Sequence, residues 1–439
     1  MVEDPAGRIA RLERLRKMGL RPARDVPRPA PPERPRDENE LPGEPVMTPF
    51  GEAWVRTERF SLAGDLDLAR FRDASPATLA AIGQDPMLEA LDPARAAYID
   101  TETTGLSLGA ETYTFLIGVG QYEPPSEAYP AGSFAVSQFF MRSPQEEASQ
   151  LYLVEEALGR TTGFVSFNGR SFDLPLVTNR FVLARMPVRF AGRPHLDLLP
   201  AARRVWRARW QSCSLGSLEQ NVLALQRSQD DVPGWMIPGI YRDYYRAGGG
   251  ADMLARVFYH NLQDIVSMAL LGARLAGLFQ PDRLEEILTG LHPLECMSLA
   301  RCYEALDWTE AGIAAYRMAH ATLPDDDGRA AALRQLGFLY KRLGRQEDAA
   351  AVWEEWLSGL TGDDLTPYIE LAKHHEWRTL DLEASRGWAG WALHIAERWP
   401  PGTARDDGIG DLQRRIARLE RKLQDRDATP VSGESFDKA

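Results

Sequence analysis

One stretch decides the fold of this chain, Tyr98-Ile-Asp100-Thr-Glu102-Thr-Thr-Gly105-Leu106, and it closes a short apolar run that begins at Ala96. Such a run predicts a buried strand. Residues i and i+2 of a strand point to the same side, so Asp100 and Glu102 would present two carboxylates together at the strand's end. Two acids this close repel each other unless cations lie between them. The pattern favours a site for two divalent ions, Mg²⁺ or Mn²⁺, about 3.5–4 Å apart.

The segments on either side of this stretch predict an α/β domain. Strand-like text occurs at residues 53–62, and β-branched and aromatic runs at 112–122 and 132–141 follow the first strand, which predicts a meander. Helical text at 144–158, a buried strand at 163–167 and several helices as far as Leu278 come next. Strands followed by interleaved helices predict a mixed sheet with helices packed on its faces.

The length of 439 residues, 44% of them hydrophobic, allows two or three domains. Residues 1–46 are rich in proline and charge and cannot bury a core, so we expect a disordered lead. The α/β domain would then run from residue 47 to about residue 280. Residues 401–439 predict one amphipathic helix before a polar tail.

A repeat occupies residues 281–400, where strand signals stop. Leu299-Ala-Arg-Cys-Tyr303 recurs as Leu336-Gly-Phe-Leu-Tyr340, and a weaker third copy starts at Leu371. This spacing resembles tetratricopeptide repeats, in which paired helices stack and offer a concave surface to a protein partner. The sequence leaves open a second interpretation, a helical cap that only stabilises the first domain.

The charge of the chain restricts how it could contact nucleic acid. A formal net charge of −12 argues against a protein that coats nucleic acid over its whole surface. Between residues 160 and 210, however, there are ten arginines and only two acids, so a local contact with nucleic acid is expected there. Trp206 and Trp210 in this window could stack on bases or belong to the core. The arginines that we expect to bind phosphates are Arg170, Arg203, Arg204 and Arg207.

The composition also suggests where the protein works. No stretch approaches the roughly 20 apolar residues of a membrane span, and we expect a cytoplasmic protein without a membrane partner. The three cysteines, Cys213, Cys296 and Cys302, lack the spacing of zinc ligands and are expected to be buried thiols.

Taken with its flanking residues, the Asp100 segment resembles the first motif of the DEDD superfamily of 3′–5′ exonucleases. The resemblance implies that Thr103, Thr104, Gly105 and Leu106 form a turn beside the terminal nucleotide. It also assigns the second motif to Phe167-Asn168-Gly-Arg-Ser-Phe172-Asp173, with Asp173 as the third acid and Asn168 in contact with backbone or substrate. An acid at the start of a helix could otherwise be an N-cap.

The third motif is a helix that carries a general base and the last acid, and here it matches Tyr259-His260-Asn-Leu-Gln-Asp264. His260 and Asp264 are i and i+4, on one face of the helix. The usual forms of the motif place a tyrosine four residues, or a histidine five residues, before the acid, so this chain departs from both. On a regular helix Tyr259 lies well away from Asp264, which makes His260 the candidate base and Tyr259 a packing residue.

This departure looks most like the YprB-like branch of ribonuclease-H-like proteins, which are predicted exonucleases. The match includes His195-Leu-Asp197-Leu-Leu, and Asp197 could be an auxiliary acid or a helix N-cap. The resemblance implies two-metal hydrolysis of DNA or RNA, as a single strand or at an end, by Asp100, Glu102, Asp173 and Asp264 with His260. Two alternatives remain: an adaptor that binds nucleic acid, with little catalysis, and recruits a protein through its repeats, or a structure-specific endonuclease on the same fold.

Overall fold

The computed structural model describes residues 41–63, 68–105, 111–247, 250–359 and 362–428. Most of the expected disordered lead, the residue Leu106 of the first motif and the expected polar tail from residue 429 lie outside these ranges. The first strand already starts at Glu44, before the expected domain boundary at residue 47, and Leu41 is buried.

Within the part of the chain that the structure describes, seven strands form one mixed sheet in the order β1-β2-β5-β4-β3-β6-β7. The predicted meander is confirmed, because β3, β4 and β5 pair antiparallel in sequence order. β6 runs parallel to β3, and β7 runs parallel to β6. The strands are β1 (Glu44–Thr48), β2 (Gly51–Ser61), β3 (Ala97–Thr103), β4 (Thr114–Glu123), β5 (Ser133–Phe140), β6 (Phe164–Ser166) and β7 (His195–Asp197).

Helices cover both faces of the sheet, as the sequence predicted. On one face α4 (Glu147–Gly159) and α5 (Asp173–Leu183) pack on Ile99, Ile117 and Phe139. On the other face Tyr98 and Val136 pack against a cluster that includes α9 (Ala251–Leu278). Also in this domain are α2 (Leu68–Arg72), α3 (Pro76–Gly83), α6 (Leu198–Trp206), α7 (Leu215–Asn221) and α8 (Ile237–Ala247).

Helix α9 approaches the sheet closely because β4 carries glycine beneath it. A Cβ on Gly118 would lie 2.3 Å from both Asn261 Oδ1 and Ile265 Cδ1, and one on Gly120 would lie 2.6 Å from Ile265 Cγ2. Atoms cannot approach so closely, so both positions need glycine. This contact brings the polar residues of α9 over the end of β3.

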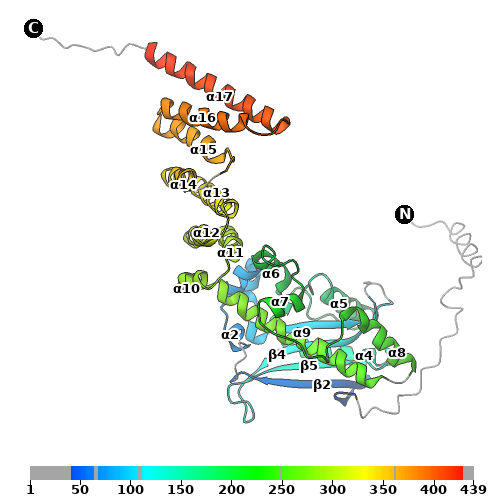
Figure 1. Cartoon of the computed structure of the whole chain (residues 1–439). Helices are drawn as coiled ribbons and strands as arrows, with labels where there is room; N and C mark the ends of the chain where they lie inside the picture. Colours follow the sequence, from blue (N-terminus) through cyan, green and yellow to red (C-terminus); the bar gives the residue numbers. More distant parts are fainter. Residues whose placement is uncertain (1–40, 64–67, 106–110, 248–249, 360–361, 429–439) are drawn as a thin grey trace, which may run out of the picture.

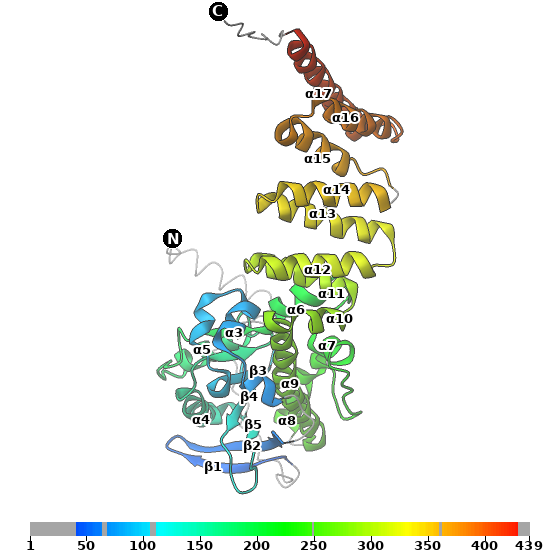
Figure 2. The same ribbon diagram turned by 90° about the vertical axis from the view of Figure 1, so that its left-hand side faces the viewer.

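Helix pairs follow the α/β domain and extend away from it as a column (Figures 1 and 2). The short α10 (Leu284–Thr289) leads into three pairs, and α17 packs on the last of them. The repeated positions Leu299, Leu336 and Leu371 are all fully buried. The helices are α11 (Pro293–Ala305), α12 (Thr309–Thr322), α13 (Asp326–Arg342), α14 (Gln346–Gly359), α15 (Thr366–His374), α16 (Leu382–Glu397) and α17 (Thr403–Ala428).

One hydrophobic cluster runs from the α/β domain into this column without a break, from Leu62 to Leu371. Tyr303 on α11 donates a hydrogen bond to the Leu278 carbonyl at the end of α9, at 2.6 Å. Arg209 forms an ion pair with Glu295 at 3.0 Å across the same junction. The column is therefore joined to the α/β domain by a shared core and by polar contacts.

Among the described residues no single helix has the length and apolarity to cross a membrane. The pair formed by α9 and the segment Pro281–Thr289 meets those two criteria only jointly, with a 71° bend between its parts.

Candidate active site at the end of strand β3

The site begins at the end of β3, where Asp100 and Glu102 lie half-buried on the side of the sheet that α9 covers. Thr101 and Thr103 alternate with them and are buried on the other side. The pairing with β4 shifts register between Glu102 and Thr103, so the strand ends irregularly just after the two acids. The alternation expected from strand geometry is confirmed here.

Asn261 of α9 fixes Asp100. Its Nδ2 donates to Asp100 Oδ2 at 2.8 Å and to the Asp100 carbonyl at 3.3 Å. Its Oδ1 accepts a hydrogen bond from Gln138 Nε2 at 2.8 Å, and Asn261 is fully buried. The amide is therefore locked between β3 and β5, and it holds one oxygen of Asp100 in place.

Asp173 reaches the same place from α5, the helix that follows β6. Asn168 has φ of 70° and starts a tight turn, in which a Cβ on Gly169 would lie 2.6 Å from Ser166 Oγ. The turn ends at α5, where Phe172 is the N-cap and no side chain caps the helix. Asp173 instead accepts a hydrogen bond from Thr101 Oγ1 at 2.5 Å and is buried. It therefore does not act as the helix N-cap.

His260 and Asp264 lie one turn apart on α9 and meet as the spacing predicted. His260 Nε2 lies 3.6 Å from Asp264 Oδ2, while Nδ1 lies 2.7 Å from Asp231 Oδ1. The contact with Asp231 favours the tautomer with a proton on Nδ1, which leaves the Nε2 lone pair on the side of Asp264. Tyr259 accepts a hydrogen bond from the Ser228 backbone N–H at 3.0 Å and so holds the loop before α8.

Arg227, which the sequence did not single out, lies between these groups. Its guanidinium donates a short hydrogen bond to Asp264 Oδ1, and Nε donates to Glu219 Oε2 at 2.7 Å. Nη1 lies 3.4 Å from Asp231 Oδ2 and 3.3 Å from His260 Nδ1. Arg227 is therefore the positive group that faces the last acid of the site.

Burial, together with neighbouring negative charges, raises the pKa of each of the four acids. Burial and the charges of Asp264 and Asp173 raise the pKa of Asp100 well above its usual range. The pKa of Glu102 is raised well above its usual range by burial and by the charges of the other three acids. Burial raises the pKa of Asp173 to about 6 against the hydrogen bond from Thr101, and burial likewise raises the pKa of Asp264. The four predicted acids therefore lie within electrostatic range of one another.

The donor set fits Mg²⁺ or Mn²⁺ in chemistry, because carboxylate oxygens are hard ligands and their repulsion is relieved by a cation. Across the described ranges, however, no group of three or more His, Cys, Asp or Glu side chains is already arranged around an ion position. Arg227 partly explains why no ion position is preformed, since its guanidinium is bonded to Asp264, where a divalent ion would be ligated.

Asp197 has a clear structural role. It is the N-cap of α6 and accepts a hydrogen bond from the Leu199 N–H at 3.1 Å. It also accepts hydrogen bonds from the backbone N–H groups of Asn168 at 2.8 Å and Arg170 at 3.2 Å. Of the two interpretations left open, the N-cap is the one these contacts support, and Asp197 also fixes the turn that leads to Asp173.

A cavity of about 690 Å³ opens beside the acids. Asp100 and Asp264 line one side of it, and Arg203 and Arg207 line another, with Asn168 also on its wall. Both arginines are exposed, and among the described residues neither side chain has a carboxylate partner. Arg170 is exposed but does not line this cavity; it donates to the His195 carbonyl at 2.8 Å and lies 3.6 Å from Asp85 Oδ2.

Arg204, which we expected to bind phosphates, does not line this cavity. Its guanidinium donates a hydrogen bond to the Ile82 carbonyl, and it lies near Cys302 at the junction with the helical column. Other arginines of the same window also have structural partners, such as Arg180 with Glu147 and Arg193 with the Thr161 carbonyl at 3.0 Å. The basic window therefore overstated the charge that is free for phosphates.

The two tryptophans of this window, unlike Arg203 and Arg207, do not line the cavity. Trp206 is buried in the core, and Trp210 packs partly buried against the same core.

The predicted turn after β3 is described as far as Gly105. Thr103 Oγ1 donates to the Gly105 carbonyl at 2.7 Å, and Thr104 accepts a hydrogen bond from the Tyr113 N–H at 3.0 Å. These bonds fix the turn next to Glu102.

Cys213, expected to be buried, is only partly so and lies on the wall of the cavity, whereas Cys296 and Cys302 are buried as predicted.

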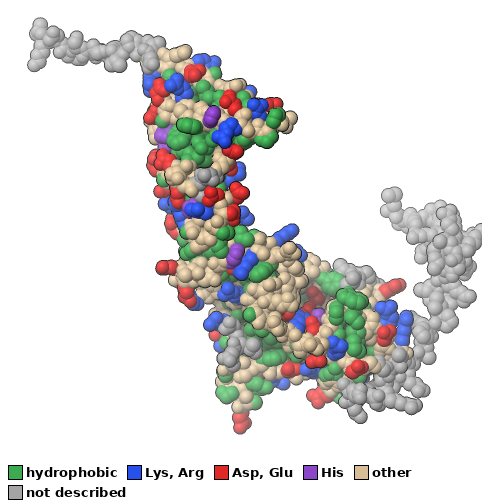
Figure 3. All heavy atoms as spheres, in the orientation of Figure 1, with side chains coloured by type: hydrophobic (Ala, Val, Ile, Leu, Met, Phe, Trp, Pro, Cys, Tyr) green, Lys and Arg blue, Asp and Glu red, His purple; other side chains and the backbone are tan. Residues whose placement is uncertain are grey.

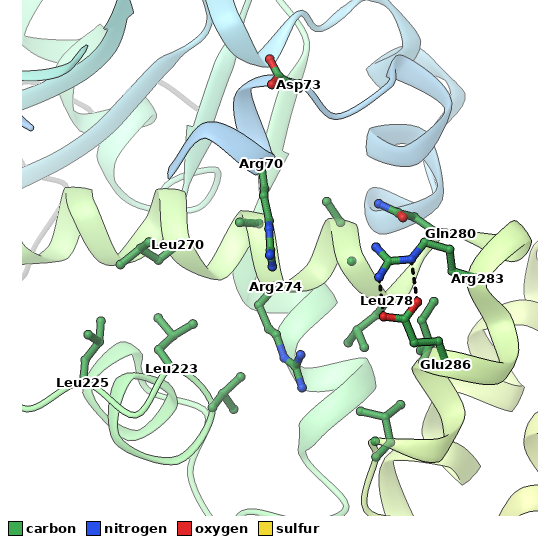
Figure 4. A pocket seen from close by; sticks show the side chains of 17 residues that line it. Arg70, Asp73, Leu223, Leu225, Leu270, Arg274, Leu278, Gln280, Arg283 and Glu286 are labelled. Atoms are coloured by element: carbon green, nitrogen blue, oxygen red, sulfur yellow. Dashed lines mark hydrogen bonds and ion pairs between the residues drawn. The ribbon is translucent and has the colours of Figure 1, made fainter. Parts of the chain in front are cut away.

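A second cavity, of about 810 Å³, adjoins the first and shares Leu215 and Asp264 with it. His260, Arg227 and Glu219 line it. A third, of about 780 Å³, lies at the start of the helical column (Figure 4), where Arg70 and Arg274 point into it beside Leu270. It contains none of the four acids.

Comparison with known proteins places the region that contains these residues in a known superfamily. The family model described as the RNase_H superfamily matches residues 97–276, which span β3, Asp173 and α9. The uncharacterized protein YprB of Bacillus subtilis strain 168 is 31% identical over 339 residues, and the match covers 74% of each chain. This chain therefore belongs to the ribonuclease H superfamily and to the same family as YprB.

Proposed function

We propose that this protein is a metal-dependent nuclease that removes nucleotides from the 3′ end of a DNA or RNA strand. Membership of the ribonuclease H superfamily suggests nucleic-acid phosphodiester hydrolysis, and proteins of this superfamily typically use divalent metals. The observation that carries the finer proposal is the meeting of four mutually repelling carboxylates, from β3, α5 and α9, at one end of the sheet.

In this proposal Asp100, Glu102, Asp173 and Asp264 would hold Mg²⁺ or Mn²⁺. When bound, such ions lower the pKa of water and stabilise the charge on a leaving oxygen. Asn261 keeps Asp100 in one orientation, and Thr101 keeps Asp173 in one orientation. His260, with its Nδ1 held by Asp231, orients the attacking water or takes its proton at Nε2.

The substrate strand would lie along the cavity that contains Arg203 and Arg207. Two unpaired guanidinium groups one helical turn apart suit consecutive phosphates, whose charge drives most nucleic-acid binding. Thr104, Gly105 and Asn168 lie close to the acids and would contact the terminal nucleotide, whereas Thr103 is buried on the other side of β3 and would only hold the turn.

The experiment is digestion of single-stranded DNA and RNA labelled at the 5′ or the 3′ end, with Mg²⁺ or Mn²⁺ and with EDTA as the control. A ladder that shortens from the 3′ end, only with metal, supports the exonuclease and names its substrate. Internal fragments from junction or loop substrates would support the endonuclease instead. Absence of cleavage on every substrate would reject both.

A second candidate is an adaptor that grips nucleic acid and recruits a protein. Two observations favour it: Arg227 is bonded to Asp264, and the column exposes large apolar side chains. Trp377 is 55% exposed, Leu380 69% and Trp391 60%. In Figure 3 hydrophobic side chains gather in the region where Figure 1 labels α15 and α16, between mixed acidic and basic groups.

The repeats, if tetratricopeptide-like as their spacing suggests, would take that partner on this surface. Retained binding to nucleic acid without cleavage would favour the adaptor.

A further inference from the structure

Arg227 is the most constrained charged side chain near the acids. Its guanidinium contacts the carboxylates of Glu219, Asp231 and Asp264 and lies 3.3 Å from His260 Nδ1. The side chain is 14% exposed, and that of Glu219 only 3%. Burial works to lower the pKa of Arg227, but the hydrogen bond and charge of Glu219 and the charge of Asp264 outweigh it, so the guanidinium stays charged.

The loop that carries Arg227 is held against α9 by hydrogen bonds. The contact of Arg227 with Asp264 is therefore supported by a fixed backbone. Arg256 Nη2 donates to the carbonyls of Gln229 at 2.8 Å and Asp231 at 3.1 Å, and Nε donates to the Asp230 carbonyl at 2.9 Å. Tyr259 holds the Ser228 N–H. Val232, further along the loop, is buried in a hydrophobic cluster with Val257 and Phe258.

The position of Arg227 conflicts with a site that is ready for two metal ions. The guanidinium occupies a lone pair of Asp264 Oδ1 and places a positive charge beside that carboxylate, so it competes with a divalent ion for Asp264. Arginine presents five donors and is always charged, so it can replace a cation electrostatically, but it cannot ligate a water and lower its pKa as a divalent ion does. The other acids, Asp100, Glu102 and Asp173, are not bonded to any cation among the described residues.

We propose that Arg227 takes the place of one metal ion in the site when no substrate is bound. Asp264 becomes free for the second divalent ion only when a substrate phosphate binds the guanidinium and draws it away from Asp264. This proposal rests on the proposed function, in which Asp264 is a metal ligand. The cavity lined by Arg227, Asp264 and His260 gives a phosphate access to all three. Arg227 is thus a positioning residue that links nucleic-acid binding to metal loading, and keeps the site short of one ion when no strand is present.

The test is the number of Mn²⁺ ions bound by the full chain, measured by electron paramagnetic resonance of free Mn²⁺ and by calorimetry. The probes are Mn²⁺ alone and Mn²⁺ with saturating thymidine 5′-monophosphate. We expect one tight site without the nucleotide and two with it. In Arg227→Gln we expect two sites without the nucleotide, with the second bound at least about tenfold more tightly than in the unaltered chain.

Arg256→Gln is the matched control, because Arg256 holds the same loop but contacts none of the acids of the site. It should bind Mn²⁺ as the unaltered chain does, so that loosening of the loop is separated from loss of the cation. If Arg227→Gln does not fold because Glu219 is left buried without a partner, the double variant Arg227→Gln, Glu219→Gln removes both charges and should show the same two sites.

Identical Mn²⁺ binding by Arg227→Gln and the unaltered chain would overturn the proposal, and so would two tight sites in the unaltered chain without the nucleotide. Either result would leave the proposed nuclease intact. Failure of the unaltered chain to bind any Mn²⁺, with or without the nucleotide, would instead reject the proposed function itself.

Discussion

At the scale of single residues, the site depends on the residues that hold the acids in place as much as on the acids themselves. Asn261 is the clearest case, because it joins Asp100 on β3 to Gln138 on β5. Replacing it would remove the hydrogen bond to the half-buried Asp100, while Gln138 would keep its bond to the Phe258 carbonyl at 2.8 Å. An unmet buried polar group costs about 1–3 kcal/mol.

We therefore expect Asn261→Ala to lower the free energy of unfolding by about 1–3 kcal/mol, measured by urea denaturation. Asn221→Ala serves as the control, because Asn221 is exposed on α7 and its amide only bonds the preceding turn. That change should alter the free energy of unfolding by less than about 0.5 kcal/mol. Equal effects of the two variants would contradict the role given to Asn261.

The sequence revealed the residues whose relation is local and missed those whose relation is long-range. Asp100 and Glu102 follow from strand alternation, and His260 with Asp264 from helix spacing. Asn261 and Asp100 lie 161 positions apart, and Arg227 and Asp264 lie 37 apart in a loop without periodicity. Arg204 was misplaced for the same reason, since its partner at Ile82 is 122 positions away.

At the scale of elements, the packing of α9 on β4 positions half of the site. Gly118→Ala would place a methyl group 2.3 Å from Asn261 Oδ1, so the helix must move away from the sheet. We expect a loss of about 1–3 kcal/mol in the free energy of unfolding and weaker binding of Mn²⁺, measured by denaturation and calorimetry.

Gly277→Ala, near the other end of the same helix, is the control, because nothing lies within 4 Å of the added atom. Alanine is favoured over glycine in a helix by about 0.8–1.0 kcal/mol, so this variant should be as stable or more stable. Unchanged stability and Mn²⁺ binding in Gly118→Ala would show that α9 is not held as described.

The loop before α8 is an element for which the sequence predicted no role. Trp235 is 81% exposed in this loop, two residues beyond Pro233 and next to Gly234, both of which line the cavity with His260 and Asp264. An exposed indole on a fixed loop can stack on a base, which contributes about 1–3 kcal/mol per base.

We expect Trp235→Ala to weaken binding of a fluorescent single-stranded oligonucleotide by at least about fivefold, measured by anisotropy in Ca²⁺ to prevent turnover. Trp391→Ala on α16, which is also exposed, should leave binding unchanged. Equal weakening by both variants, or by neither, would remove Trp235 from the binding surface.

At the scale of the whole molecule, the strands, the meander and the order of the helices could be predicted, because the spacing of apolar residues within each segment indicates its secondary structure. The continuous core that joins the sheet domain to the column could not, since Tyr303 and Leu278 meet only through the packing of α11 on the domain. The third helix pair also departs from the first two, with a π-helical turn at His375–Thr379 before α16.

The stability of the molecule without metal should depend on pH through the acids. Asp100 and Glu102 have pKa values raised well above the usual range in the folded state, so the folded chain binds more protons than the unfolded chain and loses stability as pH rises. His195 acts in the opposite direction, because burial lowers its pKa to about 4, but its effect ends near its usual value of 6.5.

We therefore expect the melting temperature in EDTA to fall as pH rises through the raised pKa values of these acids, and Mn²⁺ to cancel the fall. Asp100→Asn should show a smaller fall in EDTA. A melting temperature that rises with pH over this range in EDTA would contradict the electrostatic account of the site.

The most direct measurement is the rate of metal-dependent release of nucleotides from a single strand by the unaltered chain, Asp100→Asn and Asp243→Asn, each shown to be folded by its circular dichroism. Asp243 is exposed on α8 and contributes no contact to the acids. Loss of a ligand that supplies several kcal/mol should slow Asp100→Asn by at least about a hundredfold, with Asp243→Asn unchanged. Full activity in Asp100→Asn would contradict the account.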